Sequence, residues 1–400
     1  MEWGEQKLSS LCDMFTDGDW VESKDQSAEG VRLIQTGNVG EGVFKDRRDK
    51  SRFISEETFS RLKCTEILEG DCLVSRLPDP VGRSCLIPFT GEKMITAVDC
   101  TIIRLNRSHL LPEFFNYFTQ SYAYLNVVES LTSGATRKRI SRKNLGEVPI
   151  PLPPIPEQQR IVAILDQAFA DIEKARANAE KNLKNAHELF DSYLDSVCEK
   201  ASPLPARLIG DVCNLYQGIA INKKTKHLLV EKSSLPLLRI KDLKHNSEEQ
   251  YVAEEGYPVN ARVYENDILY TRTGSLGLVF KGRSGVLHNN SFKVEPNELI
   301  DRDYFFWWLQ HATFKKSIMK LALKAAQPDI THAIFKQQII KIPPLSYQKE
   351  AVKNIEIHKI KTDELILKYQ AKLLGLEELK KSLLQKAFSG ELTKAEGHAA

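Results

Sequence analysis

One segment of this chain is written twice, and the repeat constrains the fold more than any other feature. The run VPIPLPPIPEQQRIVAILD, residues 148–166, has a shorter and only partly identical copy in IKIPPLSYQKEAV, residues 340–352. At a constant offset of 190 residues and with no gap, the identical pairs are Ile150/Ile340, Pro153/Pro343, Pro154/Pro344, Gln158/Gln348 and Val162/Val352. An ungapped repeat of this length predicts two copies of one structural unit.

The repeat extends in both directions and so defines domain boundaries. Upstream, Ile140-Ser141 aligns with Ile330-Thr331, and Leu145 aligns with Phe335. Downstream, the identical pairs are Leu189/Leu379, Ser192/Ser382 and Leu194/Leu384. The sequence therefore predicts a globular domain over 1–150, a proline-rich segment and long helix over 151–203, a second globular domain over 204–340, and a second helical region over 341–400.

Each copy of the repeat leads into a predicted long helix. Residues 157–201 contain no glycine or proline, and apolar residues recur in steps of four and three. Such spacing places a narrow apolar seam against a partner helix. At ~1.5 Å per residue, roughly 40 residues span about 60 Å. The seam positions are Ile161, Leu165, Ala168, Ile172, Ala175, Ala179, Asn182, Ala186, Leu189, Tyr193 and Val197 in one helix, and Val352, Ile355, Lys359, Thr362, Ile366, Tyr369, Leu373, Leu376, Lys380, Leu383 and Ala387 in the other.

The proline strip before the first helix has two interpretations. Proline lacks an N–H donor and fixes φ, so residues 151–156 are excluded from a helix interior. We predict a stiff spacer that sets where the helix leaves the domain, with Pro156 and Glu157 in the first helical turn. The alternative is a polyproline ligand for an SH3-like domain.

The globular parts read as mixed α/β domains, which makes the whole chain α+β. The runs GDCLVSR, residues 70–76, and NDILYTR, residues 266–272, resemble each other and are typical of strands. PEFFNYF, residues 112–118, and DYFFWWL, residues 303–309, predict buried aromatic helices, with core packing favoured over base stacking. TGSLG, residues 273–277, predicts a tight turn.

Composition excludes several classes of protein. The 400 residues suggest two or three domains. The net charge of +3 is nearly balanced, so any basic surface must be local. The seven cysteines follow no metal-ligand or disulfide spacing, which fits reduced cytosolic thiols. We expect no secretory signal and no membrane span, because no apolar run approaches ~18 residues.

Catalytic motifs are missing from the sequence. We find no P-loop, no Asn-Pro-Pro-aromatic or Asp-Pro-Pro-Tyr tetrapeptide, no nuclease acid-x-Lys after Pro78-Asp79 or Pro328-Asp329, and no evident nucleophilic triad.

Basic residues form the main candidate site. SGATRKRISRK, residues 133–143, crowds five cations into a predicted loop, and hydroxyls, backbone amides and Arg or Lys are the groups that bind DNA phosphates and guanine edges. The alternative is a solvated charge run, and that is how we interpret KDRRDKSR, residues 45–52. The DNA-binding candidates here are Gly134, Thr136, Arg137, Lys138, Arg139, Arg142 and Lys143.

The equivalent loop of the second copy, residues 323–336, is less basic. Its candidates are Lys324, Gln327 and His332, and the arginines that end the two matching strands, Arg76 and Arg272, complete the set. Two similar domains with different loop chemistry predict two different short recognition sequences.

The helix-entry motif PIPLPPIPEQQRIVAILD and the C-terminal LKKSLLQKAFSGEL, residues 379–392, resemble the two conserved regions of type I restriction-modification specificity (S) subunits. The likeness covers nearly the whole chain. DGDWVES, residues 17–23, and GDCLVSR fit the recognition-domain frame loosely. The second junction departs from the family pattern, because Ser346-Tyr347 stand where the first has Pro156-Glu157.

This resemblance implies a non-catalytic, cytoplasmic subunit with two target-recognition domains. Each domain would bind one half of a bipartite, asymmetric site on double-stranded DNA, and the helices would form an antiparallel coiled coil with pseudo-twofold symmetry that measures the spacer. Two methyltransferase (M) subunits would carry S-adenosylmethionine, and restriction (R) subunits would supply ATP- and Mg-dependent translocation, so this chain itself would bind no cofactor or metal. Candidates to contact M subunits are Ile164, Phe169 and Phe388, taken as exposed apolar residues.

Two other hypotheses remain open from the sequence. One is a self-contained DNA methyltransferase or nuclease, against which the missing motifs count. The other is a coiled-coil adaptor that binds only protein, against which the basic loop counts.

Overall fold

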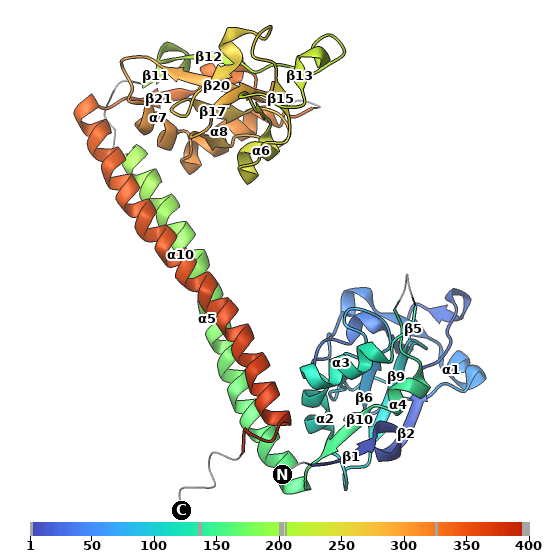
Figure 1. Ribbon diagram of the computed structural model, residues 1–400. Coiled ribbons are helices and arrows are strands. Elements are labelled where there is room, and N and C mark those ends of the chain that lie inside the picture. The colour runs from blue at the N-terminus through green and yellow to red at the C-terminus, as the bar shows by residue number, and fades with distance from the viewer. Residues whose placement is uncertain (1–2, 135–137, 200–203, 205, 325–326, 394–400) are drawn as a thin grey trace, which may run out of the picture. The chain divides into compact units, whose positions relative to one another are not determined.

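The chain forms two compact units that share two long helices. The computed structural model describes residues 3–134, 138–199, 204, 206–324 and 327–393. One unit comprises Met1–Ala179 with Ala371–Ala400, and the other comprises Glu180–Gln370. Helix α5 (Ile155–Glu199) and helix α10 (Leu345–Phe388) each contribute one half to each unit (Figure 1).

The first domain is built on three sheets. Its strands are β1 (Gly4–Lys7), β2 (Cys12–Asp17), β3 (Gln26–Ser27), β4 (Val31–Ile34), β5 (Arg52–Ile54), β6 (Cys72–Ser75), β7 (Ser84–Leu86), β8 (Met94–Thr96), β9 (Cys100–Leu105) and β10 (Pro149–Leu152). One sheet has the antiparallel order β2-β9-β6-β7. A second has the order β3-β5-β4-β8, in which β4 and β8 are parallel, and β1 pairs with β10.

Short helices cover these sheets. They are α1 (Glu56–Leu62), α2 (Pro112–Phe118), α3 (Tyr122–Ser130) and α4 (Arg142–Gly146), with 3₁₀ turns at Leu8–Leu11 (η1), Ser23–Asp25 (η2), Thr36–Asn38 (η3) and Arg48–Lys50 (η4). The aromatic helix α2 buries Phe114 and Phe115 completely, as its apolar face predicts. Ser141 caps α4 by accepting a hydrogen bond from the Asn144 amide, because serine at this position satisfies a free helix N–H.

The second domain repeats this arrangement. Its strands are β11 (Ala206–Leu208), β12 (Cys213–Gln217), β13 (Leu229–Val230), β14 (Leu237–Leu238), β15 (Tyr251–Val252), β16 (Arg262–Val263), β17 (Ile268–Thr271), β18 (Val279–Phe280), β19 (Gly285–Leu287), β20 (Ser291–Pro296) and β21 (Ile339–Lys341). The sheet β12-β20-β17-β18 matches β2-β9-β6-β7, and β11 pairs with β21 as β1 pairs with β10.

The helices of the second domain are α6 (Ile240–His245), α7 (Arg302–Trp308), α8 (Ala312–Ala322) and α9 (His332–Lys336), with 3₁₀ turns at Ile209–Asp211 (η5), Lys226–Leu228 (η6) and Val259–Ala261 (η7). Three of these helices, α7, α8 and α9, match α2, α3 and α4 of the first domain, whereas α6 follows β14 where η3 follows β4 in the first domain. Thr331 caps α9 through the Ile334 amide as Ser141 caps α4. The aromatics of α7 lie in the core, which confirms core packing for both aromatic runs.

Two glycines occupy equivalent close approaches. A Cβ built on Gly18 would lie 2.4 Å from the carbonyl oxygens of Thr96 and Ala97, and one on Gly218 would lie 2.4 Å from those of Leu287 and His288. Neither place tolerates a side chain, so glycine is required where the chain leaves β2 and β12.

The long helices pack into the domain cores and against each other within each unit. Ile161 and Leu165 from α5 join Leu384 and Ala387 from α10 in the first core, while Leu194, Val197, Ala351 and Ile355 join the second. In the first unit Arg176 pairs with Glu377 at 3.0 Å, and in the second Tyr193 stacks on His358 with ring centroids 3.8 Å apart. The start of α5 therefore lies beside the end of α10, and the converse holds in the second unit.

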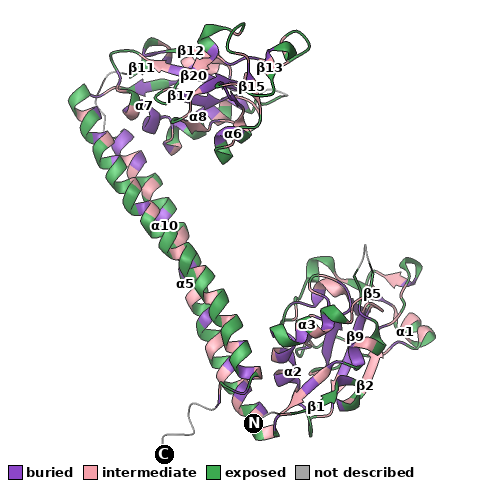
Figure 2. Cartoon of the chain, in the orientation of Figure 1, coloured by how far each residue is buried: buried purple, intermediate pink, exposed green. Residues whose placement is uncertain are grey.

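The predicted seam is buried or half-buried at most positions. Ile161, Leu165, Ile172, Ala179, Ala186 and Val197 are buried on α5, and Ile355, Thr362 and Ala387 are buried on α10 (Figure 2). Asn182 and Leu189 were predicted to lie in the seam, but both are exposed, Leu189 at 63%, so those two assignments are wrong. The buried set on α5 moves to Leu194, Val197 and Cys198, because this end of the helix packs on the aromatic core of the second domain.

A buried glutamine fixes each helix to its domain. Gln158 is fully buried, and its Nε2 donates to the carbonyl oxygens of His109 and Pro153, each at 2.9 Å. Its Oε1 accepts from the Leu111 amide at 2.9 Å. One side chain thus joins the first turn of α5, the proline strip and the start of α2.

The second copy repeats this joint. Gln348 is also fully buried, donates to the carbonyls of Leu299 and Pro343, and accepts from the Asp301 amide at 2.6 Å. The glutamines that align in the repeat are therefore the same structural joint, which explains why the motif is written twice.

The proline strip is a strand rather than a free spacer. Its residues 149–152 form β10 and pair with β1, so that Ile150 lies opposite Gln6 and Pro151 opposite Glu5. Prolines are tolerated because each strand of this two-stranded sheet is an edge strand. The prediction of an early turn for Pro156 and Glu157 is confirmed, since α5 begins at Ile155.

Two expectations from composition concern the state of the cysteines and the presence of a membrane-spanning helix. All seven cysteines are free thiols and six of them are buried. Among the described residues, every helix is too short or too polar to cross a membrane.

We expect Gln158→Leu to destabilise the first unit by about 2–4 kcal/mol, because two carbonyls and one amide would lose their only side-chain partner in a buried site. Gln159→Leu is the matched control, since Gln159 is its exposed neighbour. Chemical denaturation measures the loss, and hydrogen exchange at the Leu111 amide reports the joint directly. Equal stability of the two variants would contradict this account of the joint.

Candidate nucleic-acid interface

The arginines at the ends of the central strands occupy equivalent positions. The Arg76 amide donates to the Asp99 carbonyl and the Arg272 amide to the Asn290 carbonyl, each at 2.9 Å. The Ile140 amide donates to the Arg76 carbonyl as the Ile330 amide donates to that of Arg272. These shared backbone bonds tie each candidate loop to its sheet and align four positions: 17 with 217, 76 with 272, 99 with 290, and 139 with 329.

In the first domain the four positions hold two acids and two bases. Arg76 is buried, donates to the Val98 carbonyl at 2.5 Å and lies 3.4 Å from the Asp17 carboxylate. Arg139 pairs with Asp99 at 3.0 Å. Burial lowers the pKa of Arg76 from its ordinary value, and Asp17 opposes that shift. Arg76 is therefore engaged inside the domain, and its contact with DNA stays a prediction.

In the second domain the same positions hold a different set of charges. Arg272 donates to both carboxylate oxygens of Asp329 and to the Gln217 side-chain oxygen at 3.1 Å. Gln217 in turn donates to the Asn289 carbonyl at 2.6 Å. Because its guanidinium is bound by Asp329 and Gln217, Arg272 is an ion-paired residue rather than a free cation, and its contact with DNA stays a prediction.

The two clusters thus place different charges on equivalent positions. The first has Asp17, Arg76, Asp99 and Arg139, and the second has Gln217, Arg272, Asn290 and Asp329. Each set is electrically neutral, yet the loop position carries an arginine in one domain and an aspartate in the other. The frame is conserved between copies while the loop-to-sheet contact is specific to each copy.

The basic loop of the first domain is partly committed to internal ion pairs. Lys138 contacts Glu129, and the Arg139 backbone pairs with Ser133. Arg142 and Lys143 are exposed on α4, and Gly134 is exposed with φ of 108°. Thr136 and Arg137, also predicted, lie outside the described residues. Lys138 and Arg139 are exposed but ion-paired, and Arg142 and Lys143 are exposed beside them.

The second loop presents weaker charge. Lys324 and Gln327 are exposed, whereas His332 is half-buried against the Phe292 ring at 5.0 Å between centroids. Burial, reinforced by Arg272 and Lys336, lowers the pKa of His332, so its imidazole is neutral near pH 7. His332 aligns with Arg142 in the repeat, and the two domains therefore differ in charge at this position too.

Two of the predicted partner contacts are used inside the first unit. Phe388 packs edge-to-face on Phe114 and Phe118 at 5.3 and 5.2 Å between centroids, so its ring covers part of the first core. Phe169 packs on Tyr117 at 5.3 Å and lies under the Lys380 ammonium. Both were taken as exposed, and that premise is wrong. Ile164 is half-buried, and its contact with a partner stays a prediction.

Among the described residues, no group of three or more His, Cys, Asp or Glu side chains could hold a metal ion.

Sequence interpretation passed over one feature of the first domain, the segment 45–52, which was taken as plain surface. Five cations against two acids were its visible signal.

The different charges at the matched positions of the two domains predict that one set can be rebuilt in the other domain. Asp329→Arg would place a like charge beside Arg272 and should destabilise the second unit by about 1–2 kcal/mol. Adding Gln217→Asp and Asn290→Asp rebuilds the two ion pairs of the first domain and should recover most of the loss. Glu265→Arg, an equal charge change at an exposed residue, is the control, and urea unfolding is the measurement. Failure of the triple variant to recover would mean that the clusters are not interchangeable.

Comparison with known proteins agrees with this architecture. The family model of the type I restriction modification DNA specificity domain matches residues 1–181 and 206–374. The chain is 23% identical to the type I restriction enzyme EcoKI specificity subunit of Escherichia coli K12, covering 74% of this chain and 68% of that protein. It is 20% identical to the putative MjaX specificity subunit of Methanocaldococcus jannaschii, covering 98% and 94%. The chain spans about two thirds of the length of the EcoKI and StySPI subunits.

Solved structures give the same fold. A chain from a structure of the type I R-M system, described in terms of complex assembly and conformational transition, superimposes with a TM-score of 0.81 at 18% identity over 98% of both chains. The HsdS subunit from Thermoanaerobacter tengcongensis superimposes with a TM-score of 0.62 at 19% identity, covering 98% of this chain and 97% of that one. With two domains and two helices in the same order, and a family model that matches both copies, this chain belongs to the type I restriction-modification DNA specificity family.

Proposed function

We propose that this chain is the non-catalytic subunit that reads DNA sequence for a type I restriction-modification enzyme. The observation that carries the proposal is the repeat itself: two domains share one frame and one helix joint but differ in charge at equivalent loop positions. Such a pair suits a bipartite, asymmetric target, since each domain would recognise its own half-site on double-stranded DNA.

The partners follow from the same proposal. Two methyltransferase subunits would supply S-adenosylmethionine and adenine methylation, and restriction subunits would add ATP- and Mg-dependent activity. This chain would contribute recognition and spacing, and it would work in the cytoplasm, where such enzymes meet DNA. The absence of a catalytic motif in the sequence and the membership of a specificity family support a role without chemistry of its own.

Selection from a random duplex library tests the function. We expect the full chain, assembled with its methyltransferase partner, to select two short sequence blocks separated by a spacer of fixed length and free sequence. The chain alone should transfer no methyl group from S-adenosylmethionine to mixed DNA. A single uninterrupted block or methyl transfer by the chain alone would favour a self-contained enzyme, and an absence of salt-dependent DNA binding would favour a protein-only adaptor.

The helix pair is proposed to set the spacer. Removing residues 176–182 and 366–372 deletes one heptad from each helix and preserves the seam. At ~1.5 Å per residue the deletion shortens the pair by about 10 Å, which is roughly three base pairs at ~3.4 Å each. We expect a spacer shorter by about three base pairs with both blocks unchanged, read out by the same selection.

The control removes residues 176–182 alone. That variant leaves seven residues of α10 unpaired and should lose stability without gaining a new, discrete spacer. An unchanged spacer in the double deletion would show that the helices do not measure it.

A further inference from the structure

The first domain carries a cationic pocket away from the predicted basic loop. The pocket has a volume of about 500 Å³ and lies where η3 meets η4. Its lining contains three cations, two amides and no acid: Gln35, Gly37, Asn38, Arg47, Lys50, Ser51 and Arg52. None of these seven residues has an aromatic or aliphatic side chain, so the pocket suits a polar, anionic ligand rather than an unstacked base.

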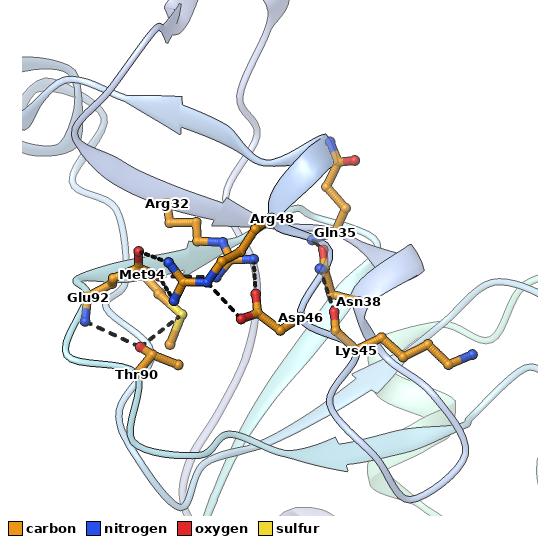
Figure 3. Close-up of polar contacts among 9 residues, drawn as sticks. All are labelled: Arg32, Gln35, Asn38, Lys45, Asp46, Arg48, Thr90, Glu92 and Met94. Atoms are coloured by element: carbon orange, nitrogen blue, oxygen red, sulfur yellow. Dashed lines mark hydrogen bonds and ion pairs between the residues drawn. The ribbon is translucent and has the colours of Figure 1, made fainter.

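Two acids near this segment, Asp46 and Glu92, are already paired with arginines. Arg32 is 2% exposed and donates to Asp46 at 2.5 Å and to Glu92 at 3.1 Å (Figure 3). Arg48 donates to the same two carboxylates, at 2.9 and 3.1 Å. The hydrogen bond from Arg32, with that from Arg48, lowers the pKa of Asp46, which stays ionised and engaged. These two acids are thus unavailable to cancel the charges of the pocket.

The segment itself is strongly basic. Residues 45–52 hold five cations and two acids, which gives +3, as large as the net charge of the whole chain. Arg47 and Lys50 are exposed, and among the described residues neither forms an ion pair. The Arg47 guanidinium lies over Gly37, where a Cβ would approach within 2.5 Å. Turning the Gln35 amide by 180° exchanges its oxygen and nitrogen, and the oxygen then accepts from Arg52 Nε and Nη1, each at 3.2 Å.

The pocket is held in shape before any ligand arrives. Asn38 donates to the Lys45 carbonyl at 2.9 Å, and the Lys45 amide donates back to the Asn38 carbonyl at 2.8 Å. Arg83 donates to the carbonyls of Thr36 and Val39 from beneath. A preformed arrangement of cations lowers the ordering cost of binding.

The second domain lacks this arrangement at the matching corner. Strand β14 pairs in parallel with β19 as β4 pairs with β8, and the Arg239 amide donates to the Asp242 side chain as the Gln35 amide does to that of Asn38. There, however, Arg239 pairs with Asp242 and Glu249, and Lys241 also pairs with Glu249. The uncompensated cations are a property of the first domain.

We propose that this pocket binds the phosphate backbone of duplex DNA, with Arg47 and Lys50 as the phosphate contacts and Arg52 positioned by Gln35. Arginine, lysine and side-chain amides supply most contacts to DNA phosphates, and such contacts anchor a domain without reading sequence. The inference rests on the proposed function, because it assumes that duplex DNA is the ligand. It adds a second point of attachment for the first domain, separate from Arg142 and Lys143.

The test compares two variants of the full chain that lose the same charge. Arg47→Gln with Lys50→Gln removes the proposed contacts, while Lys174→Gln with Lys372→Gln removes two exposed cations from the helices. The probe is a labelled duplex carrying the selected target, titrated by fluorescence anisotropy from 50 to 200 mM KCl, beside an unrelated duplex of equal length. Thermal melting checks that both variants fold.

We expect the pocket variant to flatten the slope of log K against log salt by about 1–2. Across that salt range its affinity should then change roughly tenfold less than that of the unaltered chain, on both duplexes alike. The helix variant should retain the original slope. Asp49→Asn removes the remaining free acid of the segment and should tighten binding several-fold, a gain that misfolding cannot mimic.

Each other outcome is informative. Equal slopes for the two double variants, or no gain from Asp49→Asn, would overturn the pocket assignment. A change of base preference in the first half-site would overturn the assignment to phosphate and make these residues readers of sequence. An unaltered chain that shows no salt-dependent binding to either duplex would reject the proposed function itself.

Discussion

The buried amide of Gln158, with its counterpart Gln348, is the interaction on which the rest of the architecture depends. A long helix leaving a domain has one flexible point, its first turn, and here that turn is fixed by hydrogen bonds to two segments of the domain. An amide suits the task because it donates and accepts at once in a fully buried place, where an unpaired partner would be costly. With the joint rigid, the direction of each helix is determined by its own domain.

The two domains share backbone geometry and differ in how charge is distributed over it. Equivalent backbone hydrogen bonds hold the loops before α4 and α9, yet three of the four matched positions carry different side chains in the two copies. Neutrality of each set keeps the strand ends stable. A fold of this kind tolerates new surface chemistry provided that a substitution on the loop is balanced on the sheet, which suits a domain whose target changes while its frame does not.

Much of the fold was predictable because its signals are local or repeated. The 190-residue offset aligned Ile140 with Ile330 and Gln158 with Gln348, and the heptad spacing located the seam, apart from Asn182 and Leu189. The errors came from contacts distant in sequence. The proline strip became a strand because Gly4–Lys7 pairs with it, and Phe388 became a core residue because Phe114 and Phe118 accept it. The internal partners of Arg76 and Arg272 were not predicted, because charge in a sequence does not reveal its partners. The pocket around Arg47 was missed because the carboxylates beside it find their arginines only in the folded chain.

The division of the chain into two units has a consequence for the order in which they are completed during synthesis. The second unit is one continuous stretch, Glu180–Gln370, whereas the first joins Met1–Ala179 to the last thirty residues. The N-terminus emerges first from the ribosome, so the first domain is synthesised long before the segment Ala371–Ala400 that completes its unit. Until Leu384, Ala387 and Phe388 emerge, Phe114, Phe118, Ile161 and Leu165 lack their cover. The N-terminal core is therefore the last to close, and a chain truncated near its end would leave apolar surface on the domain that was translated earliest.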